Sequence, residues 1–364
     1  MCLCYKRLEI GDFKLLPKSA WLTLNRACNL RCMWCYAQST GYNSFDKMPL
    51  ERAFKIIDII SEMNIKHISL IGGEPTIYSD LIEVIQYANK KGISCGLITN
   101  GLMLHDNNFL LKLLEAGVNS IGFSLKGYSH DDYIKVTGID GYKNSLIAIA
   151  NMVNSGIQYS VSMVLGSENI KTFLKGVRDA KDRGASNFYF SFEFDFSSLE
   201  KKTKEFDFEN KVFRVIDGFY EIYEELCRIT EGNFVLHQTF PLCIWDDSFL
   251  NILKARQQIH TSCQLLQGSG LIFNTNGDLL PCNALHNYPI GKFGVDFTTS
   301  YDLKKFINSN TTCEFYKHLS SVPSEKCFKC DKWEFCGGGC LSNWFHYDLD
   351  TLIKKFSEYK NCQI

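Results

Sequence analysis

The chain has 364 residues, and its 39 Lys and Arg residues nearly balance its 40 Asp and Glu residues. This balance disfavours a basic nucleic-acid binder and an acidic tail protein. Hydrophobic residues make up 45% of the chain, which is enough for a large α/β domain and a smaller second one. No apolar run is long enough to span a membrane, and a secretory signal is absent from residues 1–19, so we expect a cytoplasmic protein without membrane contact.

Six short apolar runs alternate with amphipathic stretches in the first two thirds of the chain. The runs lie at residues 20–25, 67–71, 94–99, 120–125, 159–165 and 187–194. The stretches between them have the apolar spacing of helices, three of them end at glycine, and a further helix is expected over 209–230. Alternating strands and helices predict a parallel sheet, and six units rather than eight predict a partial (β/α)6 barrel of the TIM type.

After about residue 235 the pattern changes to short segments rich in glycine and cysteine. We therefore expect an N-terminal extension at 1–19, a barrel at 20–235 and a small cysteine-rich domain at 236–364. The chain contains 16 cysteines. A protein of a reducing compartment carries so many only when most of them bind metal or take part in redox chemistry.

Cys28, Cys32 and Cys35 follow the first expected strand with the spacing C-x3-C-x2-C. Three thiolates in one loop leave one iron of a four-iron cluster open to another ligand, whereas a zinc loop is the alternative. The segment CNLRCMWCY resembles the signature of the radical S-adenosylmethionine (SAM) superfamily, with Trp34 as its aromatic residue. The resemblance implies a 4Fe–4S cluster on these cysteines, a SAM molecule chelated to the open iron, and a 5′-deoxyadenosyl radical released by reductive cleavage.

A second element of this resemblance follows the second expected strand. It consists of Gly72, Gly73, Glu74 and Pro75. Glycine lets backbone groups approach a ligand closely, and the Glu74 carboxylate offers an acceptor for the ammonium group of SAM. The position directly after a strand is where barrel enzymes build their sites.

Two later strand ends complete the expected SAM site. Asn100 closes the third strand, and Ser124 ends the fourth, where the family commonly places a serine against the SAM carboxylate or ribose. Lys126 stands at the acidic position of that family pattern, which is a departure from it. We expect Lys135 to replace the arginine that the family often supplies to the SAM carboxylate. The alternative for Lys135 is a solvated lysine on a helix surface.

Seven cysteines form a second pattern, which reads C-x13-G-x4-C, then C-x2-C-x5-C-x3-C, then a final cysteine. They are Cys263, Cys282, Cys327, Cys330, Cys336, Cys340 and Cys362. The pattern resembles the SPASM domain of peptide-modifying radical SAM enzymes, which holds two auxiliary 4Fe–4S clusters. A pair of zinc ribbons is the alternative, because C-x2-C is common in zinc sites. The resemblance therefore implies three 4Fe–4S clusters in the protein.

The motif positions divide these cysteines into two sets. The set implied for the distal cluster is Cys327, Cys330, Cys336 and Cys362, and the set implied for the cluster nearer the active site is Cys263, Cys282 and Cys340. The near cluster then lacks a fourth ligand. We expect Cys243 to complete it, because cysteine thiolates are the usual ligands of iron–sulfur clusters. The alternative is an open position that binds the substrate directly.

The resemblance implies an enzyme that removes a hydrogen atom from a peptide or protein while the auxiliary clusters accept the remaining electron. This favours a maturase of ribosomally synthesised peptides that forms a thioether or a carbon–carbon crosslink. A flavodoxin or ferredoxin is the expected reductant. Residues 1–19 are too few for a winged-helix leader-binding module, so a separate leader-binding protein or the enzyme surface is expected to recognise the peptide.

Other functions remain alternatives. A peptide epimerase would use a cysteine, such as Cys227 or Cys313, to return a hydrogen atom to the substrate. A sulfatase-maturating, formylglycine-forming enzyme would place an aspartate base where this chain has Asn283, whose neutral amide cannot take a proton, although Asp278 is a nearby substitute. The alternatives without SAM chemistry are a zinc-stabilised binding module and an iron–sulfur electron-transfer protein, neither of which needs residues 72–75.

Overall fold

The computed structural model describes residues 15–35, 45–193, 206–237, 240–261, 263–320 and 323–362. Cys2 and Cys4, for which the sequence leaves open an additional ligand role, lie outside these ranges together with most of the expected N-terminal extension. None of the helices in the described ranges combines the length and the apolar character that a membrane crossing requires.

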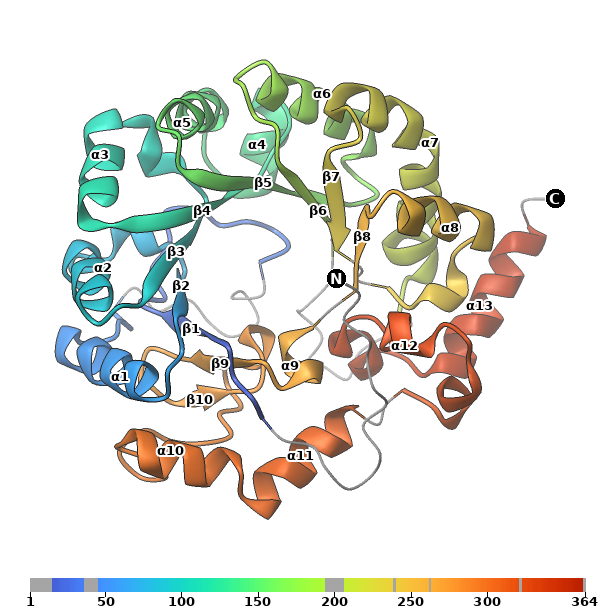
Figure 1. Ribbon diagram of the computed structural model, residues 1–364. Coiled ribbons are helices and arrows are strands. Elements are labelled where there is room, and N and C mark those ends of the chain that lie inside the picture. The colour runs from blue at the N-terminus through green and yellow to red at the C-terminus, as the bar shows by residue number, and fades with distance from the viewer. Residues whose placement is uncertain are drawn as a thin grey trace.

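A curved sheet of ten strands forms the centre of the molecule (Figure 1). The strands are β1 (Ser19–Thr23), β2 (His67–Ile71), β3 (Ser94–Thr99), β4 (Val118–Leu125), β5 (Gln158–Leu165), β6 (Phe188–Phe192), β7 (Phe234–His237), β8 (Ile259–His260), β9 (Gly270–Phe273) and β10 (Leu279–Leu280). Their order in the sheet is β10-β9-β1-β2-β3-β4-β5-β6-β7-β8. All neighbours pair in parallel except β10, which is antiparallel to β9.

The α-helices differ in where they lie, since α1–α8 surround the outside of the sheet, whereas α9 and α12 lie toward the middle of the view in Figure 1. They are α1 (Leu50–Glu62), α2 (Leu81–Lys90), α3 (Asn107–Ala116), α4 (His130–Thr137), α5 (Tyr142–Asn154), α6 (Ile170–Lys181), α7 (Arg214–Thr230), α8 (Asp247–Ala255), α9 (Gln264–Gln267), α10 (Ser300–Ile307), α11 (Asn310–Ser320), α12 (Trp333–Cys336) and α13 (Leu349–Asn361). The helix expected over 209–230 consists of one π-helical segment, Glu209–Phe213, followed by α7.

Local sequence explains how these elements begin and end. Helix α3 begins where the Asp106 carboxylate accepts a hydrogen bond from the Asn108 amide at 2.9 Å, and it ends at Gly117, whose φ of 97° favours glycine. Strand β2 is buried along residues 68–71 because helices cover the outside of the sheet and the barrel interior covers the other face. This two-sided burial is the reason that β2 is a continuous apolar run, whereas burial alternates along β4, β5 and β6.

The six expected strands are confirmed as β1–β6. Strands β7–β10 were not predicted, because two to four residues are too short for a periodicity to identify. Strand β7 pairs with β6, and β9 pairs with β1, so the sheet has more strands than expected and continues beyond residue 235. The expected fold class, a partial α/β barrel followed by a cysteine-rich region, is confirmed.

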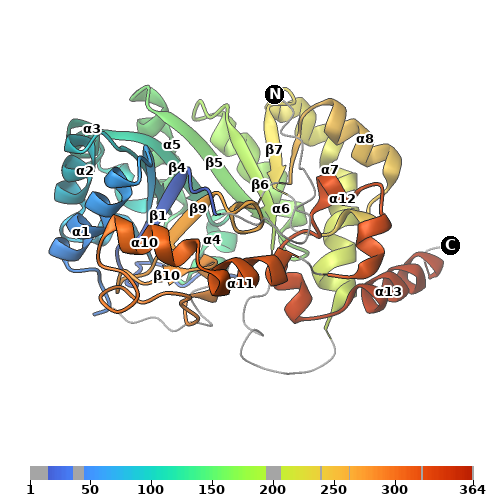
Figure 2. The same cartoon turned by 60° about the horizontal axis from the view of Figure 1, so that its bottom comes forward.

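The C-terminal region contacts both edges of this sheet. Strands β10 and β8, both from this region, form the two edges, helix α10 packs near α1, and α13 packs against the segments 209–213 and 242–244. Figure 2 shows α10, α11, α12 and α13 on one side of the molecule. The region therefore extends across the open side of the barrel.

Candidate active site

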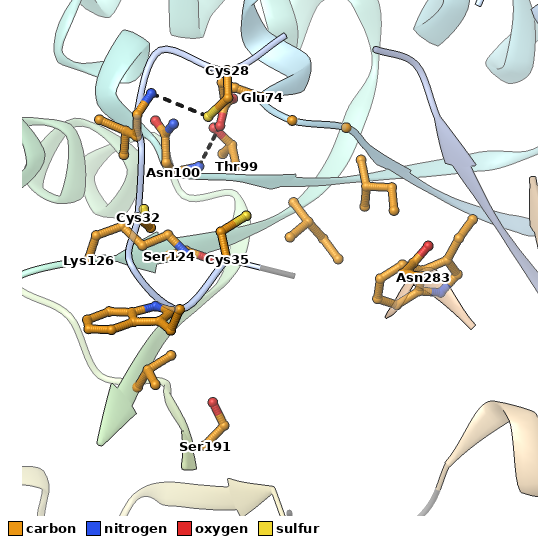
Figure 3. A pocket seen from close by; sticks show the side chains of 18 of the residues that line it. Cys28, Cys32, Cys35, Glu74, Thr99, Asn100, Ser124, Lys126, Ser191 and Asn283 are labelled. Carbon is orange, nitrogen blue, oxygen red and sulfur yellow. Dashed lines mark hydrogen bonds between the residues drawn. The ribbon is translucent and has the colours of Figure 1, made fainter. Parts of the chain in front are cut away.

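A cavity of about 380 Å³ opens where the parallel strands end (Figure 3). Its lining comes from the carboxyl ends of successive strands, including Gly72 after β2, Asn100 after β3, Ser124 in β4 and Ser191 in β6. Loops at this end of the strands carry the active sites of α/β barrels, since the scaffold holds side chains from several strands around one space. The cavity has the volume of a small-molecule site.

Cys28, Cys32 and Cys35 all line this cavity (Figure 3). The pKa of the Cys28 thiol is raised to about 11, chiefly by burial and also by the charges of Glu74 and of the other two cysteines, against a hydrogen bond from the Leu30 amide. Burial also raises the pKa of Cys32. The three thiols expected to act together are thus close enough to influence one another. The raised pKa values favour the protonated thiols of Cys28 and Cys32, and metal binding displaces such protons.

The loop that carries the cysteines is fixed to the end of α4. The amides of Arg31 and Met33 donate hydrogen bonds to the carbonyls of Thr137 and Val136, each at 3.0 Å. Within the loop, the Cys35 amide donates to the Cys32 carbonyl at 3.1 Å. These bonds hold the loop over the strand ends before any ligand binds.

Cys28, Cys32 and Cys35 fit a four-iron cluster. All three line one cavity from a single loop. Each cysteine of a four-iron cluster binds a different iron, so three cysteines leave one iron open to another ligand. Among the described residues, no three His, Cys, Asp or Glu side chains are arranged to hold one metal ion.

Glu74 is almost completely buried, with 1% of its surface exposed, and joins the ends of β2 and β3. Its Oε1 accepts hydrogen bonds from the Thr76 amide at 3.0 Å, the Thr76 hydroxyl at 2.6 Å and the Thr99 hydroxyl at 2.5 Å. Its Oε2 accepts one from the Asn100 amide at 2.8 Å. Burial raises the pKa of Glu74, although these hydrogen bonds oppose the rise. Because Oε2 has a second lone pair, Glu74 combines a structural role with one acceptor position for a ligand.

The two glycines of this segment line the cavity and also have no room for a side chain. A Cβ added at Gly72 would lie 2.1 Å from Oδ1 of Asn25, and one added at Gly73 would lie 2.3 Å from the carbonyl oxygen of Ala27. The Gly73 amide donates to the Asn25 carbonyl at 2.7 Å. The glycines therefore allow the loop after β2 to pack against the segment after β1. Pro75 follows as the first residue of a buried 3₁₀ turn.

Three more of the expected SAM contacts line the cavity, namely Trp34, Asn100 and Ser124. The Asn100 amide nitrogen donates to Oδ1 of Asn29 at 2.8 Å, and its oxygen accepts from the Leu102 amide at 3.0 Å, so this side chain positions the loops. The indole Nε1 of Trp34 is buried without a hydrogen-bond partner among the described residues. A buried donor without a partner is costly, which fits a site completed by a bound group.

Lys135 lies elsewhere. It is on α4 with 58% of its side chain exposed, and its ammonium is 3.4 Å from Oε2 of Glu168, which matches the surface-lysine alternative.

Lys126 lines the cavity instead, and its positive charge lowers the pKa of Cys32 against the larger effect of burial. Within the described part of the chain, Lys126 forms no ion pair or hydrogen bond. Lys126 was treated in the sequence analysis only as a departure from the family pattern. Its position directly after a strand end could have predicted that it lines the cavity.

The C-terminal region contributes Cys340 and Asn283 to the same cavity; Figure 3 shows Asn283 across from the loop of Cys32 and Cys35. Burial raises the pKa of the Cys282 thiol to about 12, and the charges of Cys340 and Cys263 add to the rise. Cys263, Cys282 and Cys340, expected as one set, therefore lie near one another and beside the cavity.

The described lining of this cavity contains a single carboxylate, Glu74. Asp278, the substitute base considered above, is not part of that lining. Its Oδ1 accepts a hydrogen bond from the Phe293 amide at 2.9 Å, and its backbone amide donates to Oδ1 of Asn274 at 2.9 Å. Asp278 thus serves the turn between β9 and β10 rather than the cavity.

The other C-terminal cysteines are grouped differently from the expected sets. Cys243 shares a second cavity, of about 140 Å³, with Cys327, Cys330 and Cys336. Cys362 lines a third cavity, formed by residues 206–214 and the end of α13. The structure therefore brings Cys243 to the set expected to contain Cys362.

Neither of the two cysteines considered as hydrogen donors lines the active cavity. Cys227 is on α7, where its Sγ accepts a hydrogen bond from Nη1 of Arg256 at 3.6 Å. Cys313 is on α11, where its Sγ lies 3.8 Å from the Ile307 carbonyl oxygen. Their surroundings are those of ordinary half-buried cysteines.

Most of the barrel matches a known family of sequences. Residues 22–180 match the model of the Radical SAM superfamily. Fe-coproporphyrin III synthase of Methanosarcina barkeri is 30% identical over 156 residues, covering 43% of this chain and 38% of that protein. A probable GTP 3′,8-cyclase of Thermococcus kodakarensis is 26% identical over 160 residues, covering 44% of this chain and 49% of that protein. The chain spans about half the length, or less, of these two relatives.

Solved structures resemble the chain over more of its length. Streptococcus suis SuiB bound to the precursor peptide SuiA superposes with a TM-score of 0.68 and 16% identity, over 93% of this chain and 76% of SuiB. The protein anSMEcpe with bound AdoMet gives 0.66 and 19%, over 94% of this chain and 100% of that one. At these identities the likeness shows a shared fold, which includes the cysteine-rich C-terminal region.

Proposed function

The chain is a radical SAM enzyme, and on that premise we propose that it modifies a peptide or protein held between the barrel mouth and the cysteine-rich region. The observation that carries this proposal is the lining of one cavity by both regions. Cys28, Cys32 and Cys35 line it from the barrel loop, and Cys340 lines it from the C-terminal region. A reacting group in this space is within reach of both cysteine sites.

In this proposal Cys28, Cys32 and Cys35 hold the SAM-binding 4Fe–4S cluster, and residues of the cavity orient SAM. Oε2 of Glu74 accepts a hydrogen bond from the SAM ammonium, using the lone pair left beside the Asn100 amide. The Lys126 ammonium binds the SAM carboxylate, since it is a cation of the cavity without a partner among the described residues. Lys135 has no part in the site.

When bound, the cluster and SAM supply a carbon radical that takes one hydrogen atom from the substrate, and auxiliary clusters supply an acceptor for the electron released as a new bond forms. The protein provides the surroundings for this chemistry. Apolar side chains, such as those of the half-buried Trp21 and Ile98 and of the buried Phe192, line the cavity beside the polar groups. They exclude water, which protects a reactive intermediate from side reactions.

We propose a thioether or carbon–carbon crosslink in a ribosomally synthesised peptide as the product. The substrate loses two hydrogens in such a reaction, one as a hydrogen atom and one as a proton with an electron left over. The formylglycine alternative is disfavoured because Asn283 in the cavity cannot take a proton and Asp278 serves a turn. The epimerase alternative is disfavoured because Cys227 and Cys313 do not line the described cavity.

The resemblance to SPASM enzymes supplies the rest of the proposal. Residues 20–235 form the radical SAM domain, and residues 236–364 form a SPASM domain with two auxiliary 4Fe–4S clusters. A flavodoxin or ferredoxin in the cytoplasm provides electrons, because free thiols and iron–sulfur clusters belong in a reducing compartment. A separate leader-binding protein or the enzyme surface recognises the peptide. SuiB, which shares the fold, has been solved with a precursor peptide.

The test is anaerobic turnover of the reconstituted protein in heavy water with short peptides encoded beside its gene, followed by mass spectrometry. Loss of two hydrogens from a peptide, absent with the Cys32→Ala variant, is the expected result. Gain of one deuterium without other change would replace the crosslink with epimerisation. SAM cleavage with every peptide unchanged would overturn the proposed substrate class.

A further inference from the structure

We propose that Cys243, Cys327, Cys330 and Cys336 are the four ligands of one auxiliary 4Fe–4S cluster and that Cys362 is not a ligand. The proposal rests on the proposed function, because it presupposes auxiliary clusters in the C-terminal region. It departs from the order of the cysteine pattern, in which Cys362 occupies the last ligand position and Cys243 lies upstream of the first.

The four cysteines come from separate segments that meet around one cavity of about 140 Å³. Cys243 is in the 3₁₀ turn Leu242–Ile244, Cys327 and Cys330 are in and after the turn Glu325–Lys329, and Cys336 ends α12. The volume is roughly ten times the 10–15 Å³ that one water needs. A compact inorganic group therefore has room between the four thiols.

One hydrogen bond fixes the Cys243 segment to the other cysteines. The Leu242 amide donates to Sγ of Cys336 at 3.3 Å in a buried position. Because Leu242 directly precedes Cys243, this contact sets Cys243 beside Cys336. Amide hydrogen bonds to cysteine sulfur are among the features that tune iron–sulfur clusters.

The electrostatic surroundings of Cys243 agree with this geometry. The charges that act on its thiol include those of Cys336, Cys327 and Cys330, and none of them belongs to the set of Cys263, Cys282 and Cys340. Cys243 is exposed and lines the second cavity.

Cys362 is too far along α13 to reach this cavity. Leu349 and Ile353, at the start of the helix, line the cavity, and nine further residues at about 1.5 Å each place Cys362 roughly 14 Å beyond Ile353 along the axis. Figure 1 and Figure 2 both show α13 running outward from α12. Cys362 is exposed and lines another cavity in which it is the only described cysteine.

The end of α13 is also fixed where it lies. The Tyr359 hydroxyl donates to Oδ2 of Asp217 at 2.8 Å, and the Lys360 ammonium lies 3.1 Å from Oδ1 of the same carboxylate on α7. Bringing Cys362 to the four-cysteine cavity would break both contacts and unwind the helix. With Cys243 in the second cavity, the set beside the active cavity retains Cys263, Cys282 and Cys340 and takes its fourth ligand from elsewhere.

Thiol protection in the intact protein tests the assignment without any substitution. The reconstituted full chain is alkylated anaerobically with iodoacetamide, iron is removed by a chelator, and the exposed thiols are alkylated with a heavier isotope of the reagent. We expect Cys243 and Cys327 to carry the heavy label and Cys362 to carry the light one. A light label on Cys243 together with a heavy label on Cys362 would overturn the proposal.

A matched pair of variants locates the cluster. Cys243→Ala should lose about one third of the bound iron and sulfide, which is one four-iron cluster of three, whereas Cys362→Ala should keep all of it. Alkylation of Cys243→Ala should then expose Cys327 and leave Cys263 protected. Exposure of Cys263 with Cys327 protected would assign Cys243 to the near cluster and contradict the proposal.

The outcomes distinguish a failure of this ligand assignment from a failure of the proposed function. If Cys243→Ala does not fold, as circular dichroism would show, the labelling pattern of the unsubstituted protein decides. If the reconstituted wild-type chain binds neither iron nor sulfide, the proposed function fails, and with it the cluster that these cysteines would hold. Iron and sulfide binding with Cys362 protected overturns only the ligand assignment.

Discussion

The two cysteine sites of this molecule are built in different ways. The barrel site takes Cys28, Cys32 and Cys35 from one loop, which hydrogen bonds to α4 hold over the strand ends. The second cavity takes its cysteines from segments as far apart as residues 243 and 336. Spacing along the chain determines which residues meet in a short loop, whereas tertiary packing determines which distant residues meet. A motif is therefore a better guide to the first site than to the second.

The largest expected effects are losses of SAM cleavage and of iron, and these losses differ between the two cysteine sites. Cys32→Ala should abolish 5′-deoxyadenosine formation and leave about two thirds of the iron, whereas Cys336→Ala should lose about one third of the iron and still cleave SAM. Iron analysis and chromatography of the SAM products measure both. If Cys336→Ala also abolished SAM cleavage, the two sites would not be separable as described.

Lys126→Ala should raise the KM for SAM by about tenfold to a hundredfold. This is the loss expected when a hydrogen bond between charged groups, worth about 1.5–3 kcal/mol, is removed. Lys135→Ala is the matched control, because its ammonium faces Glu168 on the surface, and its KM should equal that of the wild type. A raised KM for SAM in Lys135→Ala, with an unchanged KM in Lys126→Ala, would show that Lys135 rather than Lys126 binds SAM.

Glu74→Gln should lower the free energy of unfolding by about 1–3 kcal/mol, because an amide NH₂ group cannot accept the hydrogen bonds that the buried carboxylate accepts. Denaturant titration of the cluster-free protein measures the change. Glu168→Gln, with a side chain 70% exposed, should change it by less than about 0.5 kcal/mol. Equal effects from the two variants would argue against the Glu74 network.

A pH dependence is also expected at His286, between the two regions. Burial lowers the pKa of His286 to about 4, and the charge of Arg26 contributes. The unfolded chain binds a proton near pH 6.5 that the folded chain binds only near pH 4, so the free energy of unfolding should fall as the pH drops through this interval and stay level above it. His286→Gln should reduce this slope in denaturant titrations. An unchanged slope would show that another group causes it.

Much of the fold and of the first site was predictable from sequence because the signals are local. Strands β1–β6 are short runs rich in apolar residues between helical patterns, and Cys28, Cys32 and Cys35 lie in one loop. Strands β7–β10 were missed because they are too short to show a period.

The remaining corrections concern side-chain direction and distant packing. Lys135 has the right distance along the chain for a SAM contact, but α4 turns it toward Glu168 and the surface. In the proposed assignment Cys243 takes the place expected for Cys362, because the Leu242 contact to Cys336 brings the first segment to the cavity and the length of α13 carries Cys362 away from it. Motif spacing does not predict which residues of a helix face a cavity, and it does not predict which distant segments of the chain meet.

The most direct test of the central claim, that the barrel cavity binds SAM on a cluster held by Cys28, Cys32 and Cys35, is anaerobic formation of 5′-deoxyadenosine by the purified, reconstituted protein. We predict that the wild-type chain contains iron and sulfide and releases 5′-deoxyadenosine from SAM under reducing conditions, and that Cys32→Ala releases none. A protein that contains zinc without sulfide and leaves SAM intact would contradict the account.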